Sequence, residues 1–177
     1  TDEQLAVAEK YKDEFCQSHS LKNEQIQFVK GYIENLSDSG IAPESFDVAI
    51  SNCVVNLAAD KRKVLDGLFT ALKEGGEFYF SDVFVDRRLP ANVANHDVLY
   101  GECLGGALYL SDFEHMARDA GFRDVRRVTK RIIDIHDPKI RKMIGNASFY
   151  SVTYRLFKIS SLDYQCEDYG QSVTYNG

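Results

Sequence analysis

The sequence predicts an α/β fold, and three features of the chain carry that prediction. Helical and extended patterns alternate along its 177 residues, as they do in proteins whose helices pack on a mostly parallel sheet. The run at 46–50, Phe-Asp-Val-Ala-Ile, is apolar and β-branched enough to be a buried parallel strand. No repeat, low-complexity stretch or linker interrupts the pattern. We therefore expect one domain with one hydrophobic core.

Polar caps and glycines set the boundaries that we expect for the helices. Thr1 with Gln4 forms a capping box, and Ser111 with Glu114 forms another. Glycines end the helices. The expected elements are, in order, a helix from Thr1, strands at 26–30 and 46–50, a helix from Asp60 to Gly75-Gly76, a strand at 78–80, a helical or mixed insertion at 91–106, a helix from Ser111 to Gly121, a strand at 125–135, a short helix from Asp137-Pro138 to Gly145 and a strand at 149–159.

Composition argues against several classes of protein. The 21 basic residues against 27 acidic ones give a net charge of -6, which argues against a nucleic-acid-binding protein. The basic cluster at 126, 127, 130 and 131 alternates with apolar residues and is typical of a solvated strand face. No apolar run approaches the roughly 20 residues that span a bilayer, and we expect no secretory leader. We therefore expect a cytoplasmic protein without a membrane partner.

The cysteines favour a reducing compartment. Cys16, Cys53, Cys103 and Cys166 lie far apart in mixed surroundings, whereas a small secreted scaffold would be much denser in cysteine. Their thiols are therefore free or used for chemistry. Zinc normally takes four ligands, often in Cys-x-x-Cys pairs, and no such pair occurs here, so we expect no zinc site.

Two segments combine a cysteine with residues suited to a ligand site. Ser51-Asn52-Cys53 follows the strand at 46–50 directly, and ligands of doubly wound sheets sit just beyond such strand ends. The 101–108 segment sets Cys103 among three glycines, which favours a tight turn. A turn with a small core thiol, and a packed crossover, are the purely structural explanations of the two segments. Together, however, two thiols could converge over one pocket, and sulfur is the preferred ligand of thiophilic ions.

Several segments carry a likeness to a known family. They are Ser-Phe-Asp-Val-Ala-Ile-Ser-Asn-Cys-Val-Val-Asn-Leu at 45–57, Gly-Gly-Glu-Phe-Tyr-Phe-Ser-Asp-Val at 75–83, Gly-Glu-Cys-Leu-Gly-Gly-Ala-Leu at 101–108, and the runs at 149–157 and 166–170. In these segments the chain resembles the arsenite methyltransferases, within the class I S-adenosylmethionine-dependent methyltransferases. The Gly-Gly strand motif is common among methyltransferases, whereas the two cysteine motifs together are highly specific.

The resemblance implies roles for particular residues. Cys53 and Cys103 match the family cysteines that bind trivalent arsenic through their thiolates, with arsenite or its thiol conjugates as substrate and a thiol reductant as a further requirement. Cys16 matches no functional cysteine, and we expect Cys166 to have a tail or packing role. S-adenosylmethionine is the implied methyl donor, with Ile33 on the adenine face, Glu34 near its amino group and Asn52 beneath the methionine. The implied cofactor contacts are Gly31, Tyr32, Ile33, Glu34, Asn52, Cys53, Val54 and Leu57.

The resemblance also implies an incomplete class I methyltransferase (Rossmann-like) sheet. The family sheet has the order 3-2-1-4-5-7-6 with an antiparallel last strand, and its first two strands, glycine-rich loop and ribose-binding acidic residue have no match here. Because the chain opens at Thr1 without an initiator Met, we expect a fragment or a trimmed chain. We expect a partial methyltransferase domain at 1–159, with an insertion near 84–110, and a tail or the start of a following region at 160–177.

The expected function is methyl transfer from S-adenosylmethionine to trivalent arsenic held by Cys53 and Cys103, in arsenic detoxification. We expect these 177 residues alone to be inactive and to bind the cofactor weakly or not at all. A generic class I methyltransferase acting on a small organic molecule explains the fold but leaves the two cysteines as coincidences. A non-catalytic, thiol-based metalloid-binding fragment is the third reading, because half of the cofactor pocket has no counterpart in the chain.

Overall fold

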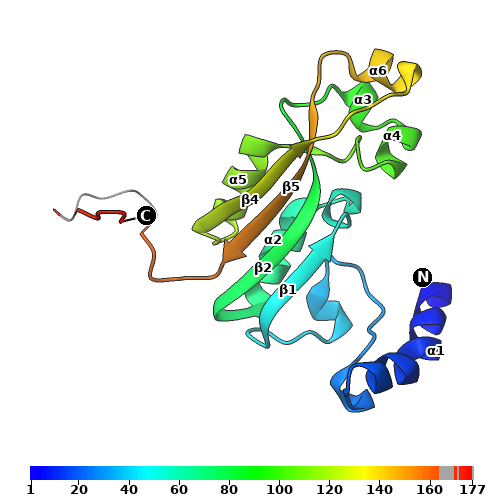
Figure 1. Cartoon of the computed structure of the whole chain (residues 1–177), viewed down its shortest axis with the longest axis vertical. Coiled ribbons are helices and arrows are strands. Elements are labelled where there is room, and N and C mark those ends of the chain that lie inside the picture. Colours follow the sequence, from blue (N-terminus) through cyan, green and yellow to red (C-terminus); the bar gives the residue numbers. More distant parts are fainter. Residues whose placement is uncertain (164–169, 171, 177) are drawn as a thin grey trace.

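A mixed β-sheet forms the centre of the computed structural model, which describes residues 1–163, 170 and 172–176 (Figure 1). Its strands are β1 (Phe46–Asn52), β2 (Leu72–Val85), β3 (Leu108–Tyr109), β4 (Asp124–Ile132) and β5 (Phe149–Phe157). They run in the order β1-β2-β5-β4, and β3 pairs with the end of β2. β1 is parallel to β2, whereas β5 is antiparallel to both of its neighbours. This arrangement confirms the 4-5-7-6 part of the predicted sheet.

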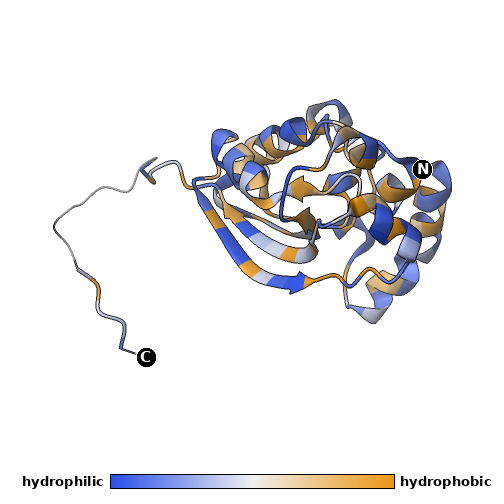
Figure 2. Cartoon of the chain, turned by 90° about the horizontal axis from the view of Figure 1, so that it is seen from above, coloured by the Kyte–Doolittle hydropathy of each residue, from blue (hydrophilic) through white to orange (hydrophobic). Residues whose placement is uncertain are grey.

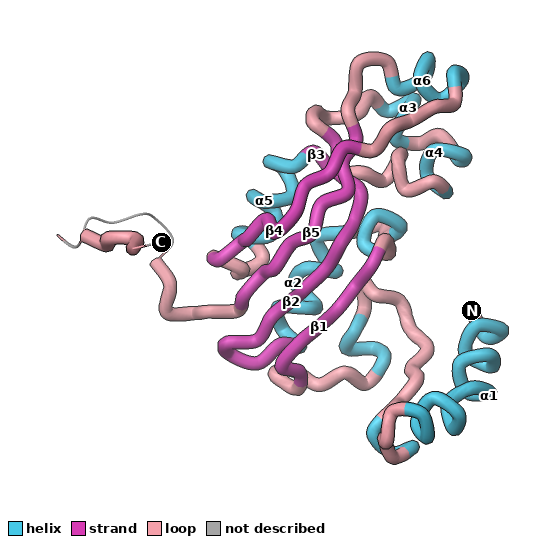
Figure 3. The backbone as a smooth tube through the Cα atoms, viewed as in Figure 1, coloured by secondary structure: helices cyan, strands magenta, loops and turns pink. Residues whose placement is uncertain are grey.

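The helices lie in three places around this sheet. They are α1 (Asp2–Ser18), α2 (Lys61–Ala71), α3 (Ala91–Ala94), α4 (Asp97–Gly101), α5 (Leu110–Asp119) and α6 (Pro138–Ile144), with 3-10 turns η1 (Asn23–Gln25), η2 (Leu36–Ser39) and η3 (Val55–Leu57). Figures 1 and 3 show α2 and α5 against one face of the sheet, α3, α4 and α6 gathered at one end, and α1 apart from the strands. Among the described residues, no helix has the length and apolar character needed to cross a bilayer.

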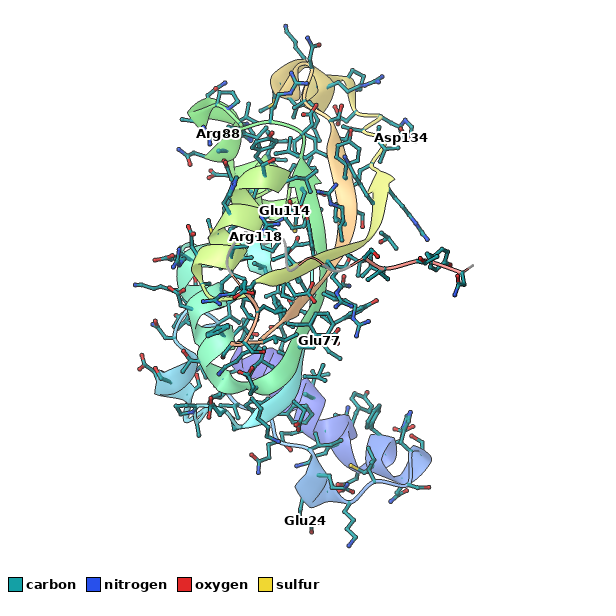
Figure 4. All side chains as sticks on the ribbon, turned by 90° about the vertical axis from the view of Figure 1, so that its left-hand side faces the viewer. Glu24, Glu77, Arg88, Glu114, Arg118 and Asp134 are labelled. Carbon is teal, nitrogen blue, oxygen red and sulfur yellow. The ribbon has the colours of Figure 1, made fainter. Side chains whose placement is uncertain are left out.

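An aromatic core fills the space between the sheet and the helices α2 and α5, where apolar residues gather (Figure 2). Phe80 of β2 stacks on Phe78, with ring centroids 4.5 Å apart, and meets Phe113 of α5 edge-on at 5.4 Å. Tyr154 of β5 closes the cluster and donates its hydroxyl proton to Glu114, which is labelled in Figure 4. The alternating aromatic residues of β2 thus bind the sheet to its helical layer.

A second apolar cluster holds the predicted insertion against the end of the sheet. It consists of Val85, Val93, Leu99, Leu104, Ala107 and Phe149. The cluster joins α3, α4 and the loop after α4 to the ends of β2 and β5. Because Leu104 follows Cys103 directly, this packing also fixes the position of the second cysteine segment.

Several helix boundaries confirm the sequence predictions. Thr1 and Gln4 form the capping box of α1. Asp60 caps α2 by accepting a hydrogen bond from the Lys63 amide. Asp137 caps α6, which ends at Gly145. In each case the polar cap accepts N–H groups that have no partner inside the helix.

Two helix boundaries differ from their predictions. α2 ends at Ala71, and Gly75-Gly76 lies within β2, because β2 begins at Leu72 and pairs there with Phe46. α5 begins at Leu110, so Ser111 does not cap it. Glu114, predicted to complete that box, instead accepts hydrogen bonds from Arg127 and Tyr154, which bind it to the sheet.

The strand predicted at 26–30 is wrong, because those residues form an irregular segment after η1. No strand lies beside this segment in the described part of the chain, so its backbone has no ladder to join. β1 is parallel as predicted but is not buried, since Val48 and Ile50 are 52% and 78% exposed. Within the described residues β1 pairs with β2 alone, and α2 covers only one of its faces. The strands predicted at 125–135 and 149–159 are present with ends shifted by up to three residues. The strand predicted at 78–80 is the middle of the much longer β2, and β3 was not predicted.

Candidate functional site: two thiols at the end of the sheet

Cys53 and Cys103 meet although 50 residues separate them in the sequence. Cys53 follows the last residue of β1, and its amide donates a 2.9 Å hydrogen bond to the Ser81 carbonyl of β2. Cys103 follows α4, and its Sγ lies 3.9 Å from the Cys53 carbonyl oxygen. Both thiols are free, with Cys53 exposed and Cys103 half-buried. The structure therefore brings the two predicted arsenic ligands to one place.

Both cysteines also adopt a backbone conformation that is uncommon outside glycine. The φ angle is 55° at Cys53 and 61° at Cys103, in the left-handed region. Strain of this kind persists only where the surroundings fix the backbone, and it concentrates at functional sites. Here the left-handed conformation turns the backbone sharply at each cysteine, just after β1 in one case and just after α4 in the other.

A buried polar pair fixes the turn that carries Cys53. Asn56 is 2% exposed and Asp82 is 1% exposed. The Asp82 carboxylate accepts the Asn56 amide at 3.0 Å through one oxygen and the Val83 amide at 2.8 Å through the other. The Asn56 side chain in turn donates to the Val83 carbonyl. The turn after β1 is therefore bound to the neighbouring strand by side-chain as well as backbone hydrogen bonds.

The loop that carries Cys103 is anchored from its own helix. The Leu99 carbonyl accepts hydrogen bonds from the amides of Leu104 and Gly105, at 2.8 and 2.7 Å. The Cys103 amide donates to the Tyr100 carbonyl at 3.0 Å. Leu99 and Leu104 also belong to the second apolar cluster. Backbone hydrogen bonds and apolar packing together hold Cys103 just beyond the C-terminal end of α4.

Two contacts join this loop to the Cys53 turn. The Tyr100 hydroxyl donates a 2.9 Å hydrogen bond to the Leu57 carbonyl. Gly106 lies so close to the turn that a Cβ added to it would stand 2.2 Å from the Asn56 carbonyl oxygen. Glycine is required here because no side chain fits between the two backbones. Among the three glycines around Cys103, Gly106 is thus the one that permits the close approach of the loop to the Cys53 turn.

Burial and negative charge both act on the thiols. Partial burial, followed by the negative charge of Asp82, raises the pKa of the Cys53 thiol. The pKa of Cys103 is raised by the same two causes in the same order, and then by the Cys53 thiol itself. The pKa of Asp82 is also raised by burial, against the opposing effect of its backbone hydrogen bonds. The free site therefore favours protonated thiols.

We expect iodoacetamide to alkylate both cysteines along pH profiles displaced to higher pH than that of a free cysteine derivative. The thiolate is the reactive form, and a raised pKa leaves less of it at neutral pH. Peptide mass spectrometry of timed reactions would give the rate at each cysteine. A profile at or below that of N-acetylcysteine would contradict the electrostatics described above.

Three of the predicted cofactor-binding residues line one cavity. Ile33, Asn52 and Val54 contribute to an apolar hollow of about 360 Å³ beside the end of β1. The rest of its lining comes from Leu36, Ile50, Ser51, Val55, Val64, Leu68 and Phe78. Cys53 lies between two of the lining residues in sequence, so the cavity and the Cys53 thiol share one turn.

The other predicted cofactor residues lie around this cavity rather than in it. Glu34 accepts a 2.9 Å hydrogen bond from the Ala59 amide and lines a separate hollow with Tyr32, whose side chain is 78% exposed. Gly31 packs against the Ser39 side chain. The Leu57 side chain is 45% exposed, and its carbonyl accepts the Tyr100 bond. Cys166 falls outside the described residues.

Sequence reasoning missed Asp82, Asn56 and Tyr100. Asp82 stands near the end of an apolar run, as Asn52 does, and the same strand-end argument would have identified it. Tyr100 gave no comparable signal, because only the fold places α4 against η3. In the described part of the chain, no three His, Cys, Asp or Glu side chains are grouped so as to hold a metal ion.

Comparison with known proteins identifies the family. The profile of the family described as "Methyltransferase domain" matches residues 1–121. The chain belongs to this methyltransferase family. Arsenite methyltransferases from Aquipseudomonas alcaligenes and Homo sapiens are 51% and 42% identical to this methyltransferase chain. Both alignments cover all of the chain but only 51% and 46% of the relatives, so the chain spans about half their length.

Solved structures agree with the fold of this methyltransferase chain. An arsenic(III) S-adenosylmethionine methyltransferase from Chlamydomonas reinhardtii matches 96% of the chain and 57% of its own length, with a TM-score of 0.88 and 46% identity. The YcgJ protein from Bacillus subtilis covers 89% of the chain and 80% of its own, with a TM-score of 0.62 at 16% identity, a likeness of fold alone. The chain thus has a class I methyltransferase fold.

Proposed function

We propose that the protein transfers a methyl group from S-adenosylmethionine to trivalent arsenic held by the thiolates of Cys53 and Cys103. The approach of the Cys103 thiol to the Cys53 backbone, at the end of the sheet, carries the proposal. Sulfur binds soft, thiophilic ions in preference to the hard ions that oxygen ligands favour. The full-chain likeness to arsenite methyltransferases supports the same substrate.

The described residues suit the cofactor in part. Ile33 and Val54 offer an apolar surface, and Asn52 offers a donor and an acceptor at the strand end where class I ligands sit. Bound S-adenosylmethionine supplies a methyl group on a positively charged sulfur. Asn52 and Cys53 are adjacent in one turn, so residues that hold the cofactor and residues that hold arsenic are positioned by the same backbone.

The chain's own contribution is orientation. Arsenic bound to two thiols keeps a lone pair and acts as the nucleophile, so no general base is needed at the arsenic. Neutral thiols bind arsenite by condensation, in which each S–H and As–OH pair gives one S–As bond and one water. The raised pKa of both thiols is compatible with this route, because no free thiolate has to accumulate first. Holding arsenic at a fixed place beside the cofactor cavity lowers the entropic cost of the reaction.

Incubation of the protein, prepared together with the first two sheet strands and glycine-rich loop that the family resemblance implies, with arsenite, methyl-labelled S-adenosylmethionine and a thiol reductant tests the proposal. We expect labelled methylarsenicals, separated by chromatography and measured by mass spectrometry. Protection of Cys53 and Cys103 from alkylation by arsenite, without any label transfer, would contradict methyl transfer and leave only thiol-based binding. Absence of both protection and transfer would contradict the arsenic assignment itself.

A further inference from the structure

We propose that Asp82 is a positioning residue of the arsenic site, which holds the Cys53 turn through Asn56 and places a buried negative charge beside the two thiols. The inference rests on the proposed function and adds a residue to it. Asp82 lies in one of the runs that carry the family likeness, at 75–83, but it belongs to neither the arsenic ligands nor the cofactor contacts that the likeness implied. The argument starts from its burial and its contacts.

Asp82 is buried without a salt bridge in the described part of the chain. Its partners are the backbone amides of Asn56 and Val83, one on each carboxylate oxygen. Amide donors satisfy an ionised carboxylate but do not neutralise it. The positive charge of Lys61 favours the ionised form of Asp82 without forming a salt bridge to it, and a buried charge without a direct ion pair is costly. An asparagine or an apolar residue would avoid that cost. We therefore infer that the charge of Asp82 has a function.

The strand register brings Asp82 close to the Cys53 turn. β1 and β2 pair Asn52 with Ser81, so Cys53, the first residue after β1, and Asp82 of β2 each follow one member of that pair. The turn from Cys53 to Asn56 is held to β2 at both ends, by the hydrogen bond from the Cys53 amide to the Ser81 carbonyl and by the one from the Asn56 amide to Asp82. Cys103 reaches the same turn through its contact with the Cys53 carbonyl. The negative charge of Asp82 acts on both thiols in the same sense, although they come from different segments.

Methyl transfer explains why a charge in this place is useful. The arsenic lone pair forms the As–C bond while the C–S bond of the sulfonium breaks and leaves its electron pair on sulfur. Sulfur becomes a neutral thioether, and one unit of positive charge passes to the arsenic group. A fixed carboxylate next to the arsenic ligands stabilises charge that develops there, and it needs no reorganisation during the reaction. The same charge opposes ionisation of the empty site, so it favours turnover more than binding.

Asp82→Asn removes the negative charge but keeps an amide oxygen that can still accept the Asn56 backbone amide, so it tests the charge apart from the hold on the Cys53 turn. We expect arsenite affinity, measured by protection of the thiols from alkylation, to remain within about threefold of wild type, while kcat for arsenite methylation falls about tenfold or more. Asp86→Asn is the matched control, because Asp86 also accepts a backbone amide, from Ser148, but lies one residue past β2 among other partners. It should leave both quantities unchanged. An unchanged kcat in Asp82→Asn, in a protein that methylates arsenite, would overturn the inference and leave the proposed function intact.

Asn56→Ala tests how the Cys53 turn is held to β2, even where Asp82→Asn does not fold. It removes the side-chain bond to the Val83 carbonyl and keeps the Asp82 charge and both of its amide partners. We expect arsenite affinity to fall several-fold, with no change in the methylation rate of the arsenite-saturated protein. A lowered rate at unchanged affinity, or no change in either quantity, would contradict a role for the buried Asn56 side chain in holding the Cys53 turn. A wild-type protein that does not methylate arsenite would instead overturn the proposed function.

Discussion

Cys53→Ser and Cys103→Ser are each expected to abolish arsenite methylation while S-adenosylmethionine binding persists. Serine keeps the size of the side chain but replaces a soft sulfur ligand with a hard oxygen. One remaining thiol also loses the chelate effect of two sulfurs at one place, which is worth about 100-fold or more in affinity. Calorimetry with the cofactor and a methylation assay with arsenite would measure the two properties in the same preparations.

Cys16→Ser is the control for these variants. Cys16 is 2% exposed within α1, which stands apart from the sheet, and it contacts neither cysteine of the site. Its replacement should leave arsenite methylation unchanged. Full activity in both Cys53→Ser and Cys103→Ser would remove the arsenic assignment, and methylation of a small organic acceptor would become the better explanation of the fold. Retained thiol binding without any cofactor binding would instead favour a metalloid-binding module.

Most of the fold was predictable because its signals are local. The caps at Thr1, Asp60 and Asp137 are determined by a few neighbouring residues, and the structure confirms all three. The failures come from competition with tertiary contacts. Ser111 and Glu114 have the spacing of a capping box, but Glu114 gains more from Arg127 and Tyr154 on the sheet. The segment at 26–30 has strand composition, yet a strand also needs a pairing partner.

The site was predictable in its ligands but not in its support. Strand-end logic and the family likeness pointed to Cys53 and Cys103, and the structure brings them together. The contacts that hold them depend on which side of β2 faces the turn and on where α4 packs. Asp82 and Tyr100 take part through those long-range choices, which no local pattern encodes. Sequence reasoning therefore predicted the two thiol ligands but not the residues that hold them in place.

The close approach of the two cysteine segments has a sequence determinant of its own, Gly106. Gly106→Ala is expected to lower arsenite affinity about tenfold or more. The added methyl group would stand 2.2 Å from the Asn56 carbonyl oxygen, which is too close for two atoms that are not bonded. Both neighbouring atoms belong to the backbone, so the loop and the turn must separate. Overpacking of this kind also destabilises a fold by about 1–3 kcal/mol. Thermal unfolding and thiol protection by arsenite would measure the two effects.

Gly101→Ala makes the comparison decisive. Gly101 ends α4 within a few residues of Cys103, but an added Cβ there meets no atom within 4 Å. That variant should keep wild-type arsenite affinity and stay within about 0.5 kcal/mol of wild-type stability, as surface substitutions usually do. Phenylarsine oxide, which bridges two neighbouring thiols, should protect both cysteines in Gly101→Ala and fail to do so in Gly106→Ala. Equal protection in the two variants would show that the spacing of the sulfurs does not depend on backbone contact at Gly106.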